Sequence, residues 1–332
     1  MRVVVAQCPS TQSPCTSRRS EILTVETFDT AGAAVWQAPA AVISVEAECW
    51  GGAGAGGSGL FNGGGGGGGG AYAKKTVSVT PGNNYNYHVG AGGVLDTSEG
   101  EDSWFSTSGT VKAEKGEAGS SNGTGGNSGV AANSIGDTKF DGGDGGAGSA
   151  AIGGGGGSSG GTGGNGNIGA TGDAGGAGGA APTGGAAGGA GGAENIAGAN
   201  GSNPGGGAGG AGLLSEIGGN GARGRVRLTY TAVSPPTAAF TGTPLSGDAS
   251  LSVTFTDAST ETPTSWLWEK NSGAGWVNFS DTPTVQHPSE SFAAGTWSVR
   301  LTATNAGGSD TETKTDYVIA TATATASDGK SW

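Results

Sequence analysis

Few residues of this chain have the types and spacing that chemistry requires. The two histidines, His88 and His287, lie about 200 residues apart. Asp137, Asp141 and Asp144 are spaced among glycines, where carboxylate oxygens could hold a hard cation. A solvated acidic turn is the interpretation we favour for these aspartates, and a structural hydrogen bond is the one we favour for His287. We expect His88 to face solvent.

No nucleophile motif, zinc spacing or phosphate loop stands out. The many G-x-G-x-x-G matches carry no weight in a chain with 75 glycines. We therefore predict no catalytic, cofactor-binding or metal-binding residues and no cofactor, so the chain is not expected to be an enzyme.

The three cysteines do not form a disulfide framework. Cys8 and Cys15 lie seven residues apart in an arm rich in Pro, Ser and Thr, and they could close a small disulfide loop or remain free thiols. Cys49 falls on the apolar face of a predicted strand, where a small buried hydrophobic residue is the simplest interpretation.

Composition excludes several classes of partner. The chain carries 15 basic and 27 acidic residues, giving a net charge of −12 with no basic patch, which argues against nucleic acid. No window approaches 18 apolar residues, so we expect no membrane insertion. The apolar run Val3–Ala6 is too short for a signal-peptide core.

Alternating residues predict β-strands on either side of a glycine tract. The segments 42–50 and 72–80 alternate with period two, and the second is expected to form a hairpin with 85–89 across the turn at Pro81 and Gly82. Residues 223–230 alternate again after the tract. A free linker has no need to close on a strand, so the tract, about 116–221, is predicted to be a folded insertion.

Part of the tract repeats glycine every third residue. The repeat runs from Gly154 to Gly178, and it extends back to Gly142 with Ala151 in one slot. Three residues per turn is the period of an extended left-handed helix. A continuous helix from Gly154 to Gly178 would be about 74 Å long at ~3.1 Å per residue, so the tract either projects as a rod or folds back.

Three structures are compatible with this repeat. A flexible linker and a collagen-like triple helix are two of them, although Pro182 and Pro204 are the only prolines in the tract. The third is a bundle of polyglycine-II helices held together by backbone hydrogen bonds. We favour short helices that fold back at 180–183, 194–196 and 202–204 into a compact layer.

The ordered motifs around the tract are specific enough to suggest a family. They are Val35–Pro39, Val42–Gly52, Gly63–Gly70, Ala71–Gly82, Val89–Gly93 and Gly224–Tyr230. Over about residues 26–231 the chain resembles the glycine-rich domain of phage tail-fibre and related surface proteins. The resemblance implies a virion or surface-attachment protein, and in some phage adhesins of this kind the loops of a polyglycine sandwich touch the receptor.

The composition changes at Ser234, and short strand-like runs follow over about 85 residues, which is typical of a β-sandwich. The motifs Val253–Ser259, Trp266–Trp268, Gln286–Pro288 and Gly295–Thr311 closely resemble a PKD (polycystic-kidney-disease-type) domain over about 236–320. The resemblance implies an immunoglobulin-like spacer and adhesion module. The usual W-D-F-G-D-G motif is replaced by Trp266–Asn271, so its role cannot be transferred.

These observations predict an all-β chain: a docking arm (1–22), a glycine-rich β-sandwich domain with the polyglycine-II-like insertion (23–233), a PKD-like sandwich (234–320) and a tail (321–332). We expect a non-enzymatic bacteriophage virion protein that decorates the capsid or forms part of a head or tail fibre. Its expected partners are other virion proteins through the arm, host-surface glycans or proteins, and further copies of itself, a trimer among them.

Two alternatives stay open for the function. The first is a bacterial cell-surface or secreted adhesin, and the second is an accessory module of a polysaccharide-degrading enzyme. An adhesin would need an export signal, which is not visible here, and a degrading enzyme would need a catalytic domain.

Overall fold

The computed structural model describes residues 23–94, 98–171, 175–215, 217–280 and 282–322. The predicted arm (1–22), with Cys8 and Cys15, and residues 323–332 of the tail lie outside the described residues. The described secondary structure is all β, as predicted. The chain divides into two compact units, one ending at Thr231 and the other beginning at Ala232 and including residues 40–43.

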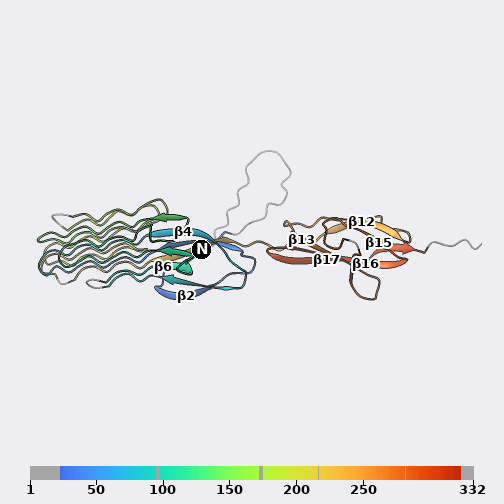
Figure 1. Ribbon diagram of the computed structural model, residues 1–332, viewed down its shortest axis with the longest axis horizontal. Coiled ribbons are helices and arrows are strands. Elements are labelled where there is room, and N and C mark those ends of the chain that lie inside the picture. The colour runs from blue at the N-terminus through green and yellow to red at the C-terminus, as the bar shows by residue number, and fades with distance from the viewer. Residues whose placement is uncertain (1–22, 95–97, 172–174, 216, 281, 323–332) are drawn as a thin grey trace, which may run out of the picture. The chain divides into compact units, whose positions relative to one another are not determined.

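The first unit contains two antiparallel sheets packed face to face (Figure 1). Its strands are β1 (Leu23–Phe28), β2 (Gly32–Gln37), β3 (Ser44–Trp50), β4 (Tyr72–Ser78), β5 (Asn84–Val89), β6 (Ser103–Ser106), β7 (Val111–Ala113), β8 (Thr138–Phe140) and β9 (Arg225–Thr231). One sheet has the order β1-β9-β3-β4-β8, and the other has the order β2-β5-β6-β7.

Alternating apolar residues form the core of this sandwich, as their period-two pattern predicts. Val226 and Leu228 of β9 are buried, and so is Cys49 of β3, which confirms its apolar position. From the second sheet, the ring of Phe105 packs 5.8 Å from that of Trp36. The core therefore uses one face of each strand.

The predicted hairpin between 72–80 and 85–89 is wrong. β4 pairs with β3 and β8, whereas β5 pairs with β2 and β6 in the other sheet. The turn at Pro81 and Gly82 thus carries the chain from one sheet to the other. Alternation shows which face of a strand is buried, but it does not identify the neighbouring strand.

The second face of β3 is also buried at its end, although alternation with period two is typical of a strand with one buried and one exposed face. Glu48 and Trp50 are both almost fully covered. Glu48 accepts two hydrogen bonds from the Arg227 guanidinium, at 2.6 and 2.7 Å, and one from the Tyr72 hydroxyl at 2.7 Å. The Trp50 indole donates to the Gly184 carbonyl at 3.1 Å. A satisfied ionic cluster therefore fills this face, which explains how charged residues can be buried there.

Beyond the strands, glycine segments run side by side as extended coils (Figure 1). The run 63–71 shows the arrangement best, because its amides donate in three directions with a period of three. Residues 63, 66 and 69 donate to segment 143–149; residues 64, 67 and 70 donate to 205–211; residues 65, 68 and 71 donate to 114–120. Its carbonyls accept from 51–57, 126–129 and 154–160. One helix thus has six neighbours, the hexagonal packing of polyglycine II.

This packing explains why glycine is required. A Cβ added to Gly67 would lie 2.2 Å from the Gly54 carbonyl oxygen, and one at Gly66 would lie 2.1 Å from that of Gly155. Peripheral segments instead expose one residue per turn, as Asp144 and Ala147 do. The every-third-residue repeat therefore separates positions that face a neighbouring helix from positions that face solvent.

The glycine tract is an ordered lattice, which agrees with the polyglycine-II interpretation and not with a linker or a collagen-like trimer. Turns lie at or next to the three predicted fold-back points, and the chain also turns at Thr162 and Gly163. The lattice is wider than the expected insertion, because segments 51–59 and 63–71 belong to it.

The second unit is a β-sandwich of the immunoglobulin-like kind. Its strands are β10 (Phe240–Thr243), β11 (Ser246–Asp248), β12 (Leu251–Asp257), β13 (Ser265–Asn271), β14 (Val277–Asn278), β15 (Ser289–Phe292), β16 (Gly295–Asn305) and β17 (Gly308–Thr321). The sheets have the orders β10-β12-β15 and β11-β17-β16-β13-β14. Trp268 lies at the centre of the core, with the rings of Phe240, Phe255 and Phe279 at 5.2, 5.5 and 5.9 Å.

Candidate functional site

The residues singled out in the sequence do not come together in one site. His88 lies on β5 of the first unit, and His287 precedes β15 of the second. His287 accepts the Asp257 amide through Nδ1 at 3.1 Å, which confirms the structural hydrogen bond expected for it. Within the described ranges, no group of three or more His, Cys, Asp or Glu residues is arranged to hold a metal ion.

The three glycine-tract aspartates instead fix the edge of the lattice. Asp144 accepts the amide and the hydroxyl of Ser128, both at 2.8 Å. Asp141 accepts the Ala131 amide at 2.5 Å, while the Asp137 amide donates to the Lys74 carbonyl at 2.8 Å. Asp137 lies at a bend, but Asp141 and Asp144 lie in an extended segment of the lattice, so the solvated acidic turn that we favoured is wrong for these two residues.

An open cavity of about 350 Å³ lies where the smaller sheet meets the glycine lattice. It is lined by His88, Gly100, Glu101, Asp102, Trp104 and Lys115. The His88 ring stacks on Trp104, with centroids 5.9 Å apart and planes 16° apart, and its Nε2 lies 3.2 Å from Glu101 Oε2. With its side chain 24% exposed, His88 is half-buried and meets solvent in the open cavity, so the expectation that it faces solvent holds in part.

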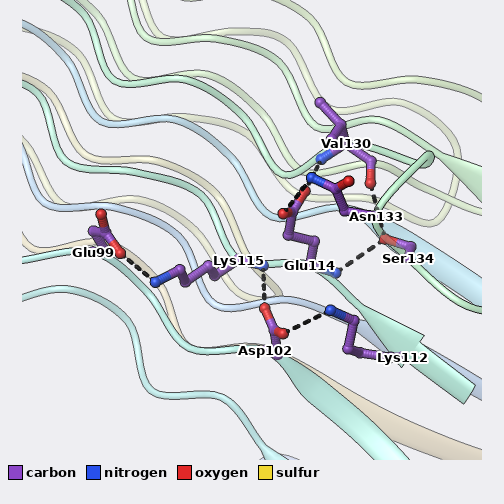
Figure 2. Close-up of polar contacts among 8 residues, drawn as sticks. All are labelled: Glu99, Asp102, Lys112, Glu114, Lys115, Val130, Asn133 and Ser134. Atoms are coloured by element: carbon purple, nitrogen blue, oxygen red, sulfur yellow. Dashed lines mark hydrogen bonds and ion pairs between the residues drawn. The ribbon is translucent and has the colours of Figure 1, made fainter. Parts of the chain in front are cut away.

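Ion pairs hold the walls of this cavity (Figure 2). Asp102, which precedes β6, connects this part of the chain to β7 and the residues after it. Its carboxylate accepts hydrogen bonds from Lys112 Nζ and from the Lys115 amide, both at 3.0 Å. The Lys115 side chain reaches back to Glu99. The neighbouring Glu114 accepts the Val130 amide at 2.6 Å, which anchors the next turn of the lattice.

Glu101 is held as a carboxylate in this cavity. The Ala91 amide, which donates to it at 3.1 Å, holds the pKa of the Glu101 carboxyl below its ordinary value. Partial burial acts in the opposite direction, and the hydrogen bond and charge of His88 lower the pKa further. An ionised carboxylate only accepts hydrogen bonds, so it suits a ligand with hydroxyl or amide donors.

A second candidate surface is formed by the turns at the end of the lattice far from the strands, which we call the distal turns (60–62, 149–152, 194–196 and 213–215). Backbone hydrogen bonds link them: Leu214 donates to Gly59, Asn195 to Leu213, and Leu213 to Ala151. Phe61 is 88% exposed and Leu214 is 63% exposed. Exposed apolar side chains that share one end of a molecule are typical of an interaction site.

Sequence reasoning did not find these two surfaces. The cavity depends on cross-strand neighbours such as His88 and Trp104, which alternation alone cannot pair. For the distal turns a signal did exist, because Leu60, Phe61 and Asn62 interrupt two long runs of small residues. Ile196 and Ile217, which are among the few large apolar residues of the tract, are also exposed.

Cys49 should be chemically inert in the folded chain. Its side chain is fully buried, and burial, reinforced by the charge of Glu48, raises the pKa of its thiol far above the ordinary value. Alkylation with iodoacetamide at pH 8, followed by peptide mass mapping, should leave Cys49 unmodified in the native chain and modify it in 6 M guanidinium. Equal labelling in both conditions would contradict its buried position.

A β-sandwich that carries a backbone-bonded lattice, together with a second β-sandwich of the immunoglobulin-like kind, fits a structural or adhesin-like module. The family model of a glycine-rich domain matches residues 28–231, more than half of the chain, and the chain belongs to this family. A PKD domain model matches residues 237–318. A search of the curated proteins found no match. No helix in the described part of the chain is long and apolar enough to cross a membrane.

Proposed function

We propose that this chain is a non-enzymatic structural protein of a bacteriophage virion, located on the extracellular surface of the particle. It decorates the capsid or forms part of a head or tail fibre. Residues 1–22 dock it on other virion proteins, and the distal turns contact the host surface. Several copies assemble together, a trimer being one option.

The observation that carries this proposal is the combination of a rigid lattice with apolar residues on its distal turns. The lattice is held by backbone bonds, so its turns are free to vary in sequence without loss of the scaffold. Exposed Phe61 and Leu214 then supply a surface that a partner can cover. The acidic charge of −12 favours protein or glycan partners over nucleic acid.

Purified phage particles provide the test. Mass spectrometry and immunogold electron microscopy with an antibody to the PKD domain should locate the chain on the virion. A chain that lacks residues 1–22 should be missing from particles, whereas a matched deletion of residues 323–332 should leave incorporation unchanged. Absence of the full-length chain from particles would overturn the proposal.

The same surfaces also suit the alternative of a bacterial cell-surface or secreted adhesin. That alternative predicts the chain in the cell envelope or culture medium of uninfected cells, where a virion protein is not made. Fractionation of cells before and after infection therefore separates the two functions. Release of reducing sugars by the purified chain would instead favour a part in polysaccharide degradation.

A further inference from the structure

The cavity between the smaller sheet and the lattice has walls that are fixed before any ligand arrives. The Gly100 amide donates to the Gly116 carbonyl and the Glu101 amide to the Ala91 carbonyl, each at 2.9 Å. The Lys115 amide is held by Asp102. A site built on such a scaffold loses little conformational entropy on binding.

The aromatic wall of the cavity carries hydrogen-bonding groups that are available to a ligand. Among the described residues, the Trp104 indole N–H has no hydrogen-bond partner, and neither has Nδ1 of His88. The Trp104 ring is half-buried, so part of it meets solvent beside the exposed carboxylate of Glu101. A ligand in the cavity would therefore meet an apolar ring and several polar groups together, as small-molecule sites commonly provide.

Most of the charge around the cavity is paired within the protein. Glu101 pairs with His88, Asp102 with Lys112, and Lys115 with Glu99. An anionic ligand would meet the carboxylates of Glu101 and Asp102, and a cation would have to compete with the lysines that pair with Asp102 and Glu99. A neutral ligand with many hydroxyl groups is neither repelled by the carboxylates nor in competition with the lysines. Its hydroxyl groups can donate hydrogen bonds to the carboxylates.

We propose that this cavity binds a neutral saccharide, whose ring packs on Trp104 while its hydroxyl groups bond to Glu101 and Lys115. The cavity volume of about 350 Å³ falls at the small end of the range for ligand sites, which suits one or a few sugar rings at the end of a glycan. The biological role of this saccharide site rests on the proposed function, in which the chain lies on the surface of the particle. Binding of the saccharide itself can be measured on the purified chain.

A structural role for the stacked pair makes a different prediction. Cross-strand aromatic pairs stabilise sheets without any ligand. If stacking were its only role, Trp104→Ala would lower stability and no saccharide would bind. The test must therefore measure binding directly, with a variant that keeps the fold.

Isothermal titration calorimetry of the full chain against neutral hexasaccharides of β-1,4-glucose, α-1,4-glucose and β-1,4-N-acetylglucosamine provides that test. At least one of them should bind, and Trp104→Ala should weaken it at least about tenfold. Glu101→Gln, which keeps the shape of the side chain, should weaken it about threefold or more. Trp276→Ala is the matched control, because Trp276 is a half-buried tryptophan of the second unit packed on Arg300, and it should leave binding unchanged.

Two results would overturn the proposal. One is that none of these saccharides binds at millimolar concentration, and the other is that Trp104→Ala and Trp276→Ala affect binding equally. If no saccharide binds but the chain is found on virions, only the saccharide site is refuted. If a saccharide binds but the chain is absent from virions, the saccharide site is supported and the function becomes that of an adhesin.

Discussion

Replacing Gly67 with alanine should destabilise the first unit by about 3 kcal/mol or more, at or beyond the upper end for overpacking a core. The new Cβ would lie 2.2 Å from the Gly54 carbonyl oxygen, which is backbone and cannot rotate away. The Gly67 amide also donates to Ala208 at 2.8 Å, and its carbonyl accepts from Gly157 at 3.0 Å. Any shift that relieves the clash therefore disrupts hydrogen bonds to two further segments.

Differential scanning calorimetry of the full chain checks this prediction. The transition of the first unit should fall by roughly 6–12 °C, since about 1 kcal/mol corresponds to ~2–4 °C at this size. The transition of the second unit serves as the internal control. Gly109→Ala is the matched variant, because a Cβ there would meet only Thr107 Oγ1, at 3.7 Å, and it should cost no more than about 0.5 kcal/mol. Equal losses in the two variants would show that lattice packing does not hold the unit together.

The period of a sequence predicts those parts of this fold that follow from local geometry. Val226 and Leu228 alternate and are buried, and the glycine repeat marks helices of three residues per turn. Neither pattern carries information on which segments are neighbours. For that reason the exchange of sheets after β4 was missed, and so was the place of segment 51–59 in the lattice.

β17 shows the same limit in the second unit. The segment Ser309–Asp316 alternates threonine with charged residues and has no apolar face, so its sequence does not predict a strand. The segment is nevertheless a strand because it pairs with β16 along most of its length. Backbone pairing with a buried neighbour thus overrides a weak local pattern.

The candidate cavity was beyond prediction for a related reason. Its residues come from β5, β6, the chain before β6 and the first lattice segment after β7. Each residue is unremarkable in its own stretch of sequence, and only the register of β5 on β6 places His88 against Trp104. Likewise, Asp102 and Lys112 meet because β6 and β7 are antiparallel neighbours.

Replacing Lys270 with methionine should destabilise the second unit by about 3–5 kcal/mol, the usual cost of removing one partner of a buried ion pair. Lys270 pairs with Glu290, and the two side chains are only 11% and 2% exposed. Methionine keeps the apolar stem beside Phe292 and Trp297, so the loss reflects charge and not volume. The Glu290 carboxylate would keep only the Ser280 amide, at 2.7 Å, and the Ser280 hydroxyl, at 3.1 Å.

Lys314→Met is the control that isolates burial. Lys314 also pairs with a glutamate, Glu312, and also lies over two aromatic rings, those of Phe240 and Tyr317. Its ion pair is 28% and 31% exposed, so its removal should cost no more than about 1–2 kcal/mol. Urea unfolding of the second unit should give a clearly lower free energy of unfolding for Lys270→Met than for Lys314→Met.

Adding Glu290→Gln to Lys270→Met should recover most of the lost stability, because burying a neutral amide costs far less free energy than burying an unpaired carboxylate. Equal losses for the two lysine variants, or no recovery in the double variant, would show that the buried charge is not the cause.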